Sequence, residues 1–177
     1  MDNFTELLLK KEKTGKEIML QVLCWSVSVL FIAVLCFIFL KINFVLLILL
    51  PILIALMIYG NVIITNMMNV EFEYSLVNNY IDIDKIIGAS KRTKILSIKT
   101  QNITEIGKFD YKEINREQFS HTLTPVSSLS ADNLWYFKAE DDKGETYFVV
   151  FEPNRRVLNH LKKFITRNIS KGVLDEF

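Results

Sequence analysis

Hydrophobic and polar positions divide the chain into two unlike parts. Residues 18–65 contain a single charged residue, and their apolar run pauses only at 41–43. The pause leaves two apolar segments, 18–40 and 44–65, and a membrane-spanning helix needs about 20 such residues. Backbone groups inside lipid must be paired within the segment. The pattern therefore predicts two transmembrane helices that form an antiparallel hairpin around the tight turn 41–43.

Beyond residue 66 the hydrophobic positions recur with a period of two, which indicates half-buried β-strands. Val70–Leu76 alternates in this way, and Asn78-Asn79 follows as a turn that tolerates positive φ. Tyr80–Ile87 then forms a hairpin with the first strand. Lys91–Lys99 completes a predicted three-stranded meander after a second turn at residues 88–90.

The remainder of the chain predicts more strands. A fourth strand is expected at Ile103–Phe109, and a second clear hairpin joins Leu134–Ala139 to Thr146–Phe151. The last of these is almost continuously apolar, which favours a buried position. Between them, Asp110–Asn133 is polar and irregular, with one expected strand around Phe119–Leu123.

A C-terminal helix is predicted to begin after Pro153 and Asn154, which suit a helix N-terminus. Apolar side chains then recur on one helical face, and basic side chains lie on the other. The apolar positions are Val157, Leu158, Leu161, Phe164 and Ile165. We expect this amphipathic helix to cover the open end of a small barrel or the face of a curved sheet, which also hides sheet edges.

Composition narrows the function classes. The chain has 21 basic and 20 acidic residues and a net charge of +1, so no overall field favours a nucleic-acid partner. Cys24 and Cys36 lie about 120° apart around the first helix, so we do not expect them to pair. Because a second apolar segment follows the first, we expect no signal peptide to be removed.

Catalytic and metal-binding signatures are missing from the sequence. His121 and His160 have no Cys or His neighbour at metal-ligand spacing, so no metal site is predicted. The carboxylates Asp82 and Asp84, and the pair at 141–142, are interpreted as solvated strand and turn residues rather than acid–base pairs. The sequence contains no glycine-rich phosphate loop and no nucleophile motif. We therefore expect no enzyme, no cofactor and no small-molecule substrate.

Basic residues flanking the hairpin predict its orientation. They are Lys10, Lys11, Lys13 and Lys16 before the first helix, Lys41 in the turn, and Lys85, Lys91, Arg92 and Lys94 after the second helix. Because flanking basic residues favour the cytoplasmic side, we predict two spans in the cell membrane with both termini cytoplasmic. Trp25 and Tyr59 are predicted to be interfacial anchors towards the same membrane face.

Two short features have two interpretations each. Phe4, Leu7 and Leu8 have helical spacing, so the N-terminal segment either forms a short amphipathic helix on the membrane surface or is a solvated lead-in. A basic group on the second and third strands either contacts anionic lipid headgroups or a protein partner, or is a solvated strand face. That group consists of Lys85, Lys91, Arg92, Lys94 and Lys99.

Val70–Ser75, followed by Asp82–Ile87 and Lys91–Ser97, is similar to the opening of bacterial pleckstrin-homology (PH) domains attached to transmembrane hairpins. Phe151–Asn154 and the helix after it resemble the end of a family of small, uncharacterised bacterial membrane proteins with this layout. The resemblance covers nearly the whole chain and implies a PH-like fold. A fold by itself does not assign an activity.

The predicted organisation is a cytoplasmic segment 1–17, transmembrane helices 18–40 and 44–65 joined by the turn 41–43, and a β domain 66–177. The fold class is thus an α+β membrane protein, in which a small antiparallel β-barrel or curved sheet with a C-terminal amphipathic helix follows the hairpin.

Two functions fit this organisation. One is a membrane-tethered, non-catalytic PH-like module that contacts lipid headgroups or a protein partner at the cytoplasmic face. The other is an accessory subunit of a larger membrane complex, bound through its transmembrane hairpin. A membrane protein partner and a homo-oligomer both stay open.

Overall fold

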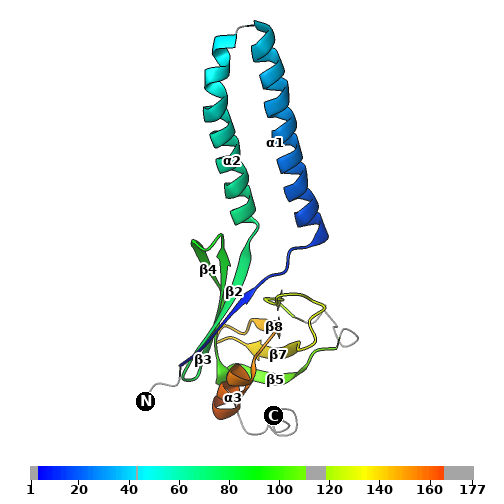
Figure 1. The fold of residues 1–177 in the computed structure, drawn as a ribbon. Coiled ribbons are helices and arrows are strands. Elements are labelled where there is room, and N and C mark those ends of the chain that lie inside the picture. Colours follow the sequence, from blue (N-terminus) through cyan, green and yellow to red (C-terminus); the bar gives the residue numbers. More distant parts are fainter. Residues whose placement is uncertain (1–3, 43, 111–118, 166–177) are drawn as a thin grey trace. The chain divides into compact units, whose positions relative to one another are not determined.

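The computed structural model describes residues 4–42, 44–110 and 119–165. It has an α+β architecture with two compact units (Figure 1). One unit comprises residues 13–69, and the other combines residues 1–12 with residues 70–177. The second unit is therefore discontinuous in sequence, because the whole first unit is inserted between its first strand and its remaining elements.

The first unit is a helical hairpin of α1 (Gly15–Ile42), the 3₁₀ segment η1 (Phe44–Leu49) and α2 (Leu50–Met67). α1 and α2 lie side by side in Figure 1. Both helical arms are long and apolar enough to cross a membrane.

The helix ends follow from local chemistry. α1 begins at Gly15, three residues before the expected start, because Thr14-x-x-Glu17 supplies a capping-box contact in which the Thr14 N–H donates to Glu17 Oε2 at 2.8 Å. Pro51 lies in the first turn of α2, where its missing N–H breaks no helical hydrogen bond. Deeper in the hairpin, Asn61 Nδ2 donates to Ser28 Oγ at 2.8 Å and ties α2 to α1.

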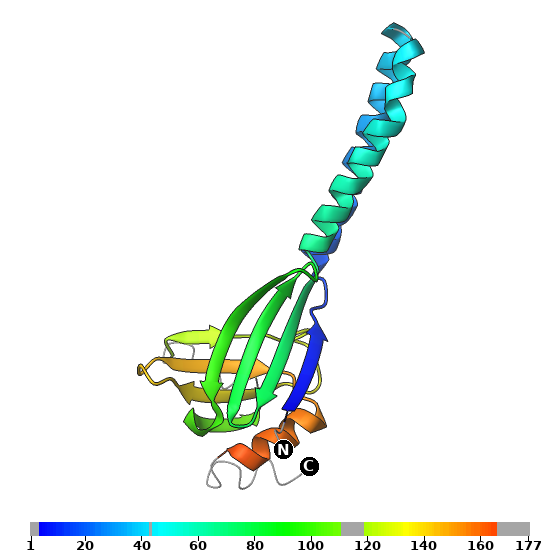
Figure 2. The ribbon, with the colours of Figure 1, turned by 90° about the vertical axis from the view of Figure 1, so that its left-hand side faces the viewer.

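The second unit contains two four-stranded sheets rather than a closed barrel. Sheet A has the antiparallel order β1 (Phe4–Lys10), β2 (Val70–Val77), β3 (Tyr80–Ile87) and β4 (Lys91–Lys99). Figure 2 shows these four strands side by side, with β1 at the edge. The predicted meander of β2, β3 and β4 is confirmed, and Asn78 in its first turn has a φ of 52°.

Sheet B has the order β5 (Ile103–Lys108), β7 (Trp135–Glu140), β8 (Thr146–Phe151) and β6 (His121–Leu123). β6 runs parallel to β8, and the other neighbours are antiparallel. The short segment η2 (Thr100–Asn102) carries the chain from sheet A to sheet B. The second hairpin and the buried position of β8 are as predicted.

β1 is the main difference from the sequence analysis. Residues 4–10 form neither an amphipathic helix nor a solvated lead-in, but pair with β2 from Phe4↔Val77 to Lys10↔Glu71. Leu7 and Leu9 pack against the core, and Leu8 between them is exposed. The helical spacing was misleading because tertiary pairing with β2 outweighs the weak local preference of so short a segment.

A buried histidine holds β1 in place. His160 lies on α3 (Arg155–Phe164), which packs against β1. Its Nε2 donates to the Asn78 carbonyl at 2.9 Å, and its Nδ1 lies 3.0 Å from Thr5 Oγ1. The ring therefore links α3, β1 and the turn between β2 and β3.

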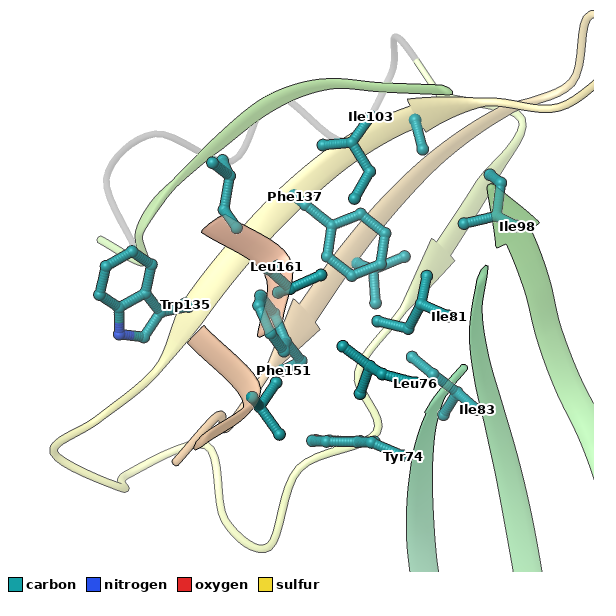
Figure 3. Packing of buried hydrophobic residues seen from close by; sticks show 14 of the residues in the cluster. Tyr74, Leu76, Ile81, Ile83, Ile98, Ile103, Trp135, Phe137, Phe151 and Leu161 are labelled. Carbon is teal, nitrogen blue, oxygen red and sulfur yellow. The ribbon is translucent and has the colours of Figure 1, made fainter. Parts of the chain in front are cut away.

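The core lies between the two sheets and α3. Figure 3 shows Tyr74, Leu76 and Ile81 of sheet A opposite Phe137 and Phe151 of sheet B, with Leu161 of α3 among them. α3 begins as predicted, since the Asn154 side chain caps it by accepting the Val157 N–H at 2.9 Å.

The Tyr74 hydroxyl makes polar contacts at the edge of this core. The Tyr74 hydroxyl donates to the Pro125 carbonyl and accepts the Glu152 N–H at 3.1 Å. Burial raises the pKa of the Tyr74 phenol, so it stays a neutral donor. The hydroxyl thus joins sheet A to the segments that flank sheet B.

The position of β1 predicts which fragments fold. We expect a chain in which a short Gly-Ser linker replaces residues 13–69 to unfold cooperatively, because Lys10 and Glu71 already face each other. A fragment of residues 70–177 should be markedly less stable, since it lacks β1 and the apolar contacts of Leu7 and Leu9. Urea unfolding followed by circular dichroism measures both; equal stability would show that β1 is dispensable.

His160→Phe should lower the free energy of unfolding by about 1–3 kcal/mol, because a ring of similar size leaves the Asn78 carbonyl without its donor. Thr5→Val should have a smaller effect, since it removes one of the two hydrogen bonds of His160. The double variant tests whether the two residues interact. If its loss of unfolding free energy equals the sum of the two single losses, the hydrogen bond between Thr5 and His160 does not contribute to stability.

Candidate functional site

The five basic residues of the predicted binding group do not form one patch. Strand alternation places Lys85 and Lys91 on one face of sheet A, and Arg92 and Lys94 on the other. Lys99 lies at the opposite end of β4, where its Nζ is 2.8 Å from Asp142 Oδ2 in the β7–β8 turn. The hydrogen bond from Lys99 lowers the pKa of the Asp142 carboxyl.

Arg92 and Lys94 are engaged by acidic side chains of their own sheet. Arg92 pairs with Glu73 of β2, and its Nε lies 3.8 Å from Asp84 Oδ2. Lys94 Nζ lies 3.2 Å from Asp82 Oδ2. Glu73 is only 7% exposed, so its pairing with Arg92 offsets the burial of a charge.

The outer face of sheet A is therefore not a basic surface. Arg92 and Lys94 lie among the carboxylates of Glu73, Asp82 and Asp84 there. The Oδ1 atoms of Asp82 and Asp84 are buried and have no hydrogen-bond partner among the described residues. Lys85 and Lys91 make no ion pair with any residue that the structure describes. The binding role of the group stays a prediction, with these two lysines as its available cations.

The two aromatic residues predicted to be anchors lie on the hairpin helices. Trp25 of α1 and Tyr59 of α2 are both exposed. Their anchoring role stays a prediction.

A pocket of about 330 Å³ lies on the outer face of sheet B. It is lined by side chains from three adjoining strands and the residues after β5. These are Glu105, Phe109, Asp110, Tyr136, Lys138 and Phe148. The alternation of β7 aims Tyr136 and Lys138 outward while their neighbours Trp135, Phe137 and Ala139 enter the core.

Three polar side chains fix one wall of this pocket. The Tyr136 hydroxyl donates to Glu105 Oε1 at 2.5 Å, and Lys138 Nζ donates to Glu105 Oε2 at 2.6 Å. Hydrogen bonds from Lys138 and then Tyr136 hold the pKa of the Glu105 carboxyl below its ordinary value. At neutral pH the wall thus carries a fixed carboxylate beside a fixed ammonium.

The pocket floor is aromatic. Tyr136 stacks on Phe148 with ring centroids 5.4 Å apart, and Phe119 lies 5.2 Å from Phe148. Lys138 Nζ lies 5.9 Å from the centroids of both Phe119 and Tyr136, within cation–π range. Gly107 makes room for this arrangement, because a Cβ there would lie 3.0 Å from Tyr136 Cε1.

The sequence analysis missed this pocket. Its partners are 31 and 33 positions apart, and a register irregularity between Ile103 and Glu105 decides that Glu105 faces Lys138. The one available signal was the polar Lys138 inside an otherwise apolar strand.

In the described ranges 4–42, 44–110 and 119–165, no group of three or more His, Cys, Asp or Glu side chains could hold a metal ion. His121 stacks on Tyr147 and lies 3.6 Å from Glu145, and His160 is the structural link to β1. Asp141 forms its turn, as predicted, by accepting the N–H groups of Lys143 and Glu145.

The lowered pKa of Glu105 predicts a pH dependence. Ionised Glu105 stabilises the fold fully above its unfolded pKa, and this contribution is lost as the pH falls through the lower folded pKa. Glu105→Gln should therefore be less stable than the wild type at neutral pH, and the gap should close in acid. Urea unfolding of both proteins from neutral to acidic pH measures the difference in their free energies of unfolding. A difference that does not change with pH would contradict a role for the Glu105 charge.

One of three comparisons with known proteins gives a match. No curated protein and no solved structure matches the chain. The family model described as a bacterial PH-like domain (DUF6106) matches residues 1–171. That match includes β1 and the hairpin as well as both sheets and α3. The chain therefore belongs to the bacterial PH-like domain family.

Proposed function

We propose that the protein is a non-catalytic module held in the cell membrane by the α1–α2 hairpin, with both termini cytoplasmic. Its PH-like domain binds a protein partner through the pocket on sheet B. PH-like domains typically bind lipids or proteins and are generally not enzymes.

Membrane insertion is supported by the surface of the hairpin. None of the described residues of α1 is buried, and large apolar side chains are exposed along both helices. Exposed apolar area of this extent is unfavourable in water and favourable in lipid. The basic residues before α1, against the single Lys41 at the turn, support cytoplasmic termini.

The observation that carries the binding proposal is the pocket itself. Ligand sites combine apolar and aromatic walls with a few fixed polar groups, and here Tyr136 and Lys138 hold Glu105 in one position. The Glu105 side chain is 45% exposed, and a carboxylate has about four acceptor positions, so it can accept further donors. The open acceptor positions of the Glu105 carboxylate favour a partner that presents a basic side chain.

Contact with anionic headgroups through sheet A has weaker support. Arg92, Lys94 and Lys99 are already paired with carboxylates of the same domain. Lys85 and Lys91 would contribute about 1 kcal/mol each near an anionic surface, which orients a domain but does not hold it there.

An accessory subunit bound through the hairpin is the second candidate. The observation that favours it is the groove beside Asn61, where the polar side chains of Asn61 and Ser28 line a largely apolar surface. A helix of a larger complex could occupy this groove.

Site-specific photocrosslinking of the full-length protein in cells tests the pocket. A photoreactive phenylalanine analogue at Phe109, which lines the pocket, should yield a discrete protein adduct. The same analogue at Tyr80, exposed on the outer face of sheet A, is the matched control and should yield none. Gly107→Val should reduce the Phe109 adduct severalfold, because the added side chain displaces the Tyr136 ring.

The same experiment separates the alternatives. An adduct that resists protease and partitions with lipid would contradict a protein partner and favour headgroup contact. Equal protein adducts from Phe109 and Tyr80, or an adduct that Gly107→Val leaves unchanged in a folded protein, would show that the pocket is not the site.

A further inference from the structure

The helical hairpin contains a buried amide that its own residues satisfy only in part. Asn61 is 5% exposed, and its Nδ2 donates to Ser28 Oγ at 2.8 Å and to the Met57 carbonyl at 2.9 Å. The Asn61 carbonyl oxygen has no hydrogen-bond partner among the described residues and is not one of the fully buried unpaired atoms, so it is open to the surface of the hairpin. An unpaired acceptor is costly in hydrocarbon, where no water can reach it.

A groove of about 330 Å³ between α1 and α2 runs beside this amide. Asn61, Cys24, Ser28 and Gly60 all line it. Gly60 leaves the groove open, since a Cβ there would meet no atom within 4 Å. Small residues of this kind allow helices in a membrane to approach each other closely.

The Asn61 amide favours an occupant of the groove that can donate a hydrogen bond to it. Lipid chains can fill the groove but offer no donor to the Asn61 carbonyl oxygen. The N–H directed at Met57 is replaceable, because that carbonyl also accepts the regular helical bond from the Asn61 backbone. A second Asn61 amide brings a donor and an acceptor with matching spacing, so two copies can satisfy each other reciprocally.

We infer that the protein forms a two-fold symmetric dimer in the membrane, in which the α1–α2 grooves of two copies face each other and their Asn61 amides pair. This inference rests on the membrane insertion proposed above. Both copies have the same orientation, so the two-fold axis runs along the bilayer normal. The two Cys24 thiols then come together in the interface, whereas Cys36 does not line the groove.

The two native cysteines supply the test. Full-length Cys36→Ser, which keeps Cys24, should form a disulfide-linked species of twice the 20.6 kDa monomer when membranes are treated with copper phenanthroline. Full-length Cys24→Ser, which keeps Cys36, should stay monomeric on the same gel. A cross-link through Cys36 and not through Cys24 would overturn the interface.

Asn61→Leu in the Cys36→Ser background should weaken dimerisation about tenfold, the size of effect expected for one interhelical polar contact. Ser26→Ala is the matched control, because Ser26 is exposed on α1 and donates only to the Val22 carbonyl. The control should leave the cross-linked fraction unchanged. Equal cross-linking of Asn61→Leu and wild-type Asn61 would overturn the pairing of amides.

Alkaline carbonate extraction distinguishes failure of this inference from failure of the proposed insertion. Release of the chain from membranes would contradict the insertion. A chain that is retained, but shows single-step photobleaching in liposomes and no Cys24 disulfide, would contradict the dimer. Cross-linking of Cys24 to a foreign polypeptide in place of a second copy would also overturn it, and would favour the accessory-subunit function.

Discussion

The antiparallel pairing of β1 with β2 joins two chain segments that the entire helical hairpin separates. This pairing completes sheet A and places Leu7 and Leu9 against the core. It also provides the strand against which α3 packs. Without β1, β2 would be an unprotected edge strand, and His160 would lose its contact with Thr5. Four residues connect β1 to α1 and two connect α2 to β2, so both ends of the hairpin continue into neighbouring strands of sheet A.

The charged side chains of the PH-like domain are arranged differently on its two sheets. On sheet A, Arg92 and Lys94 form ion pairs with acidic side chains of neighbouring strands. On sheet B, Glu105, Tyr136 and Lys138 form a fixed polar wall above an aromatic floor. Fixed polar groups beside accessible rings favour selective recognition, because binding loses little side-chain entropy there.

The proposed anchoring and self-association use the hairpin, and the proposed partner binding uses the pocket on sheet B. In the proposed dimer, the Asn61 amide would supply specificity in surroundings where apolar packing alone discriminates poorly. In the proposed partner complex, Glu105 would do the same in the pocket on sheet B. Both sites use a polar side chain held by a second polar side chain, Ser28 in one case and Lys138 in the other.

Sequence periodicity by itself determined the two helices, the strands β2 to β5, the β7–β8 hairpin and the amphipathic α3, because each leaves a local pattern of burial. Only the tertiary structure decided that residues 4–10 form a strand, since their partner β2 lies beyond the hairpin. It likewise decided that Arg92 and Lys94 are neutralised and that Glu105 meets Lys138. Those contacts depend on irregularities in the register, at Ile83/Asp84 between β3 and β4 and at Ile103/Glu105 between β5 and β7, which change the side chains that face each other and leave no periodic pattern in the sequence.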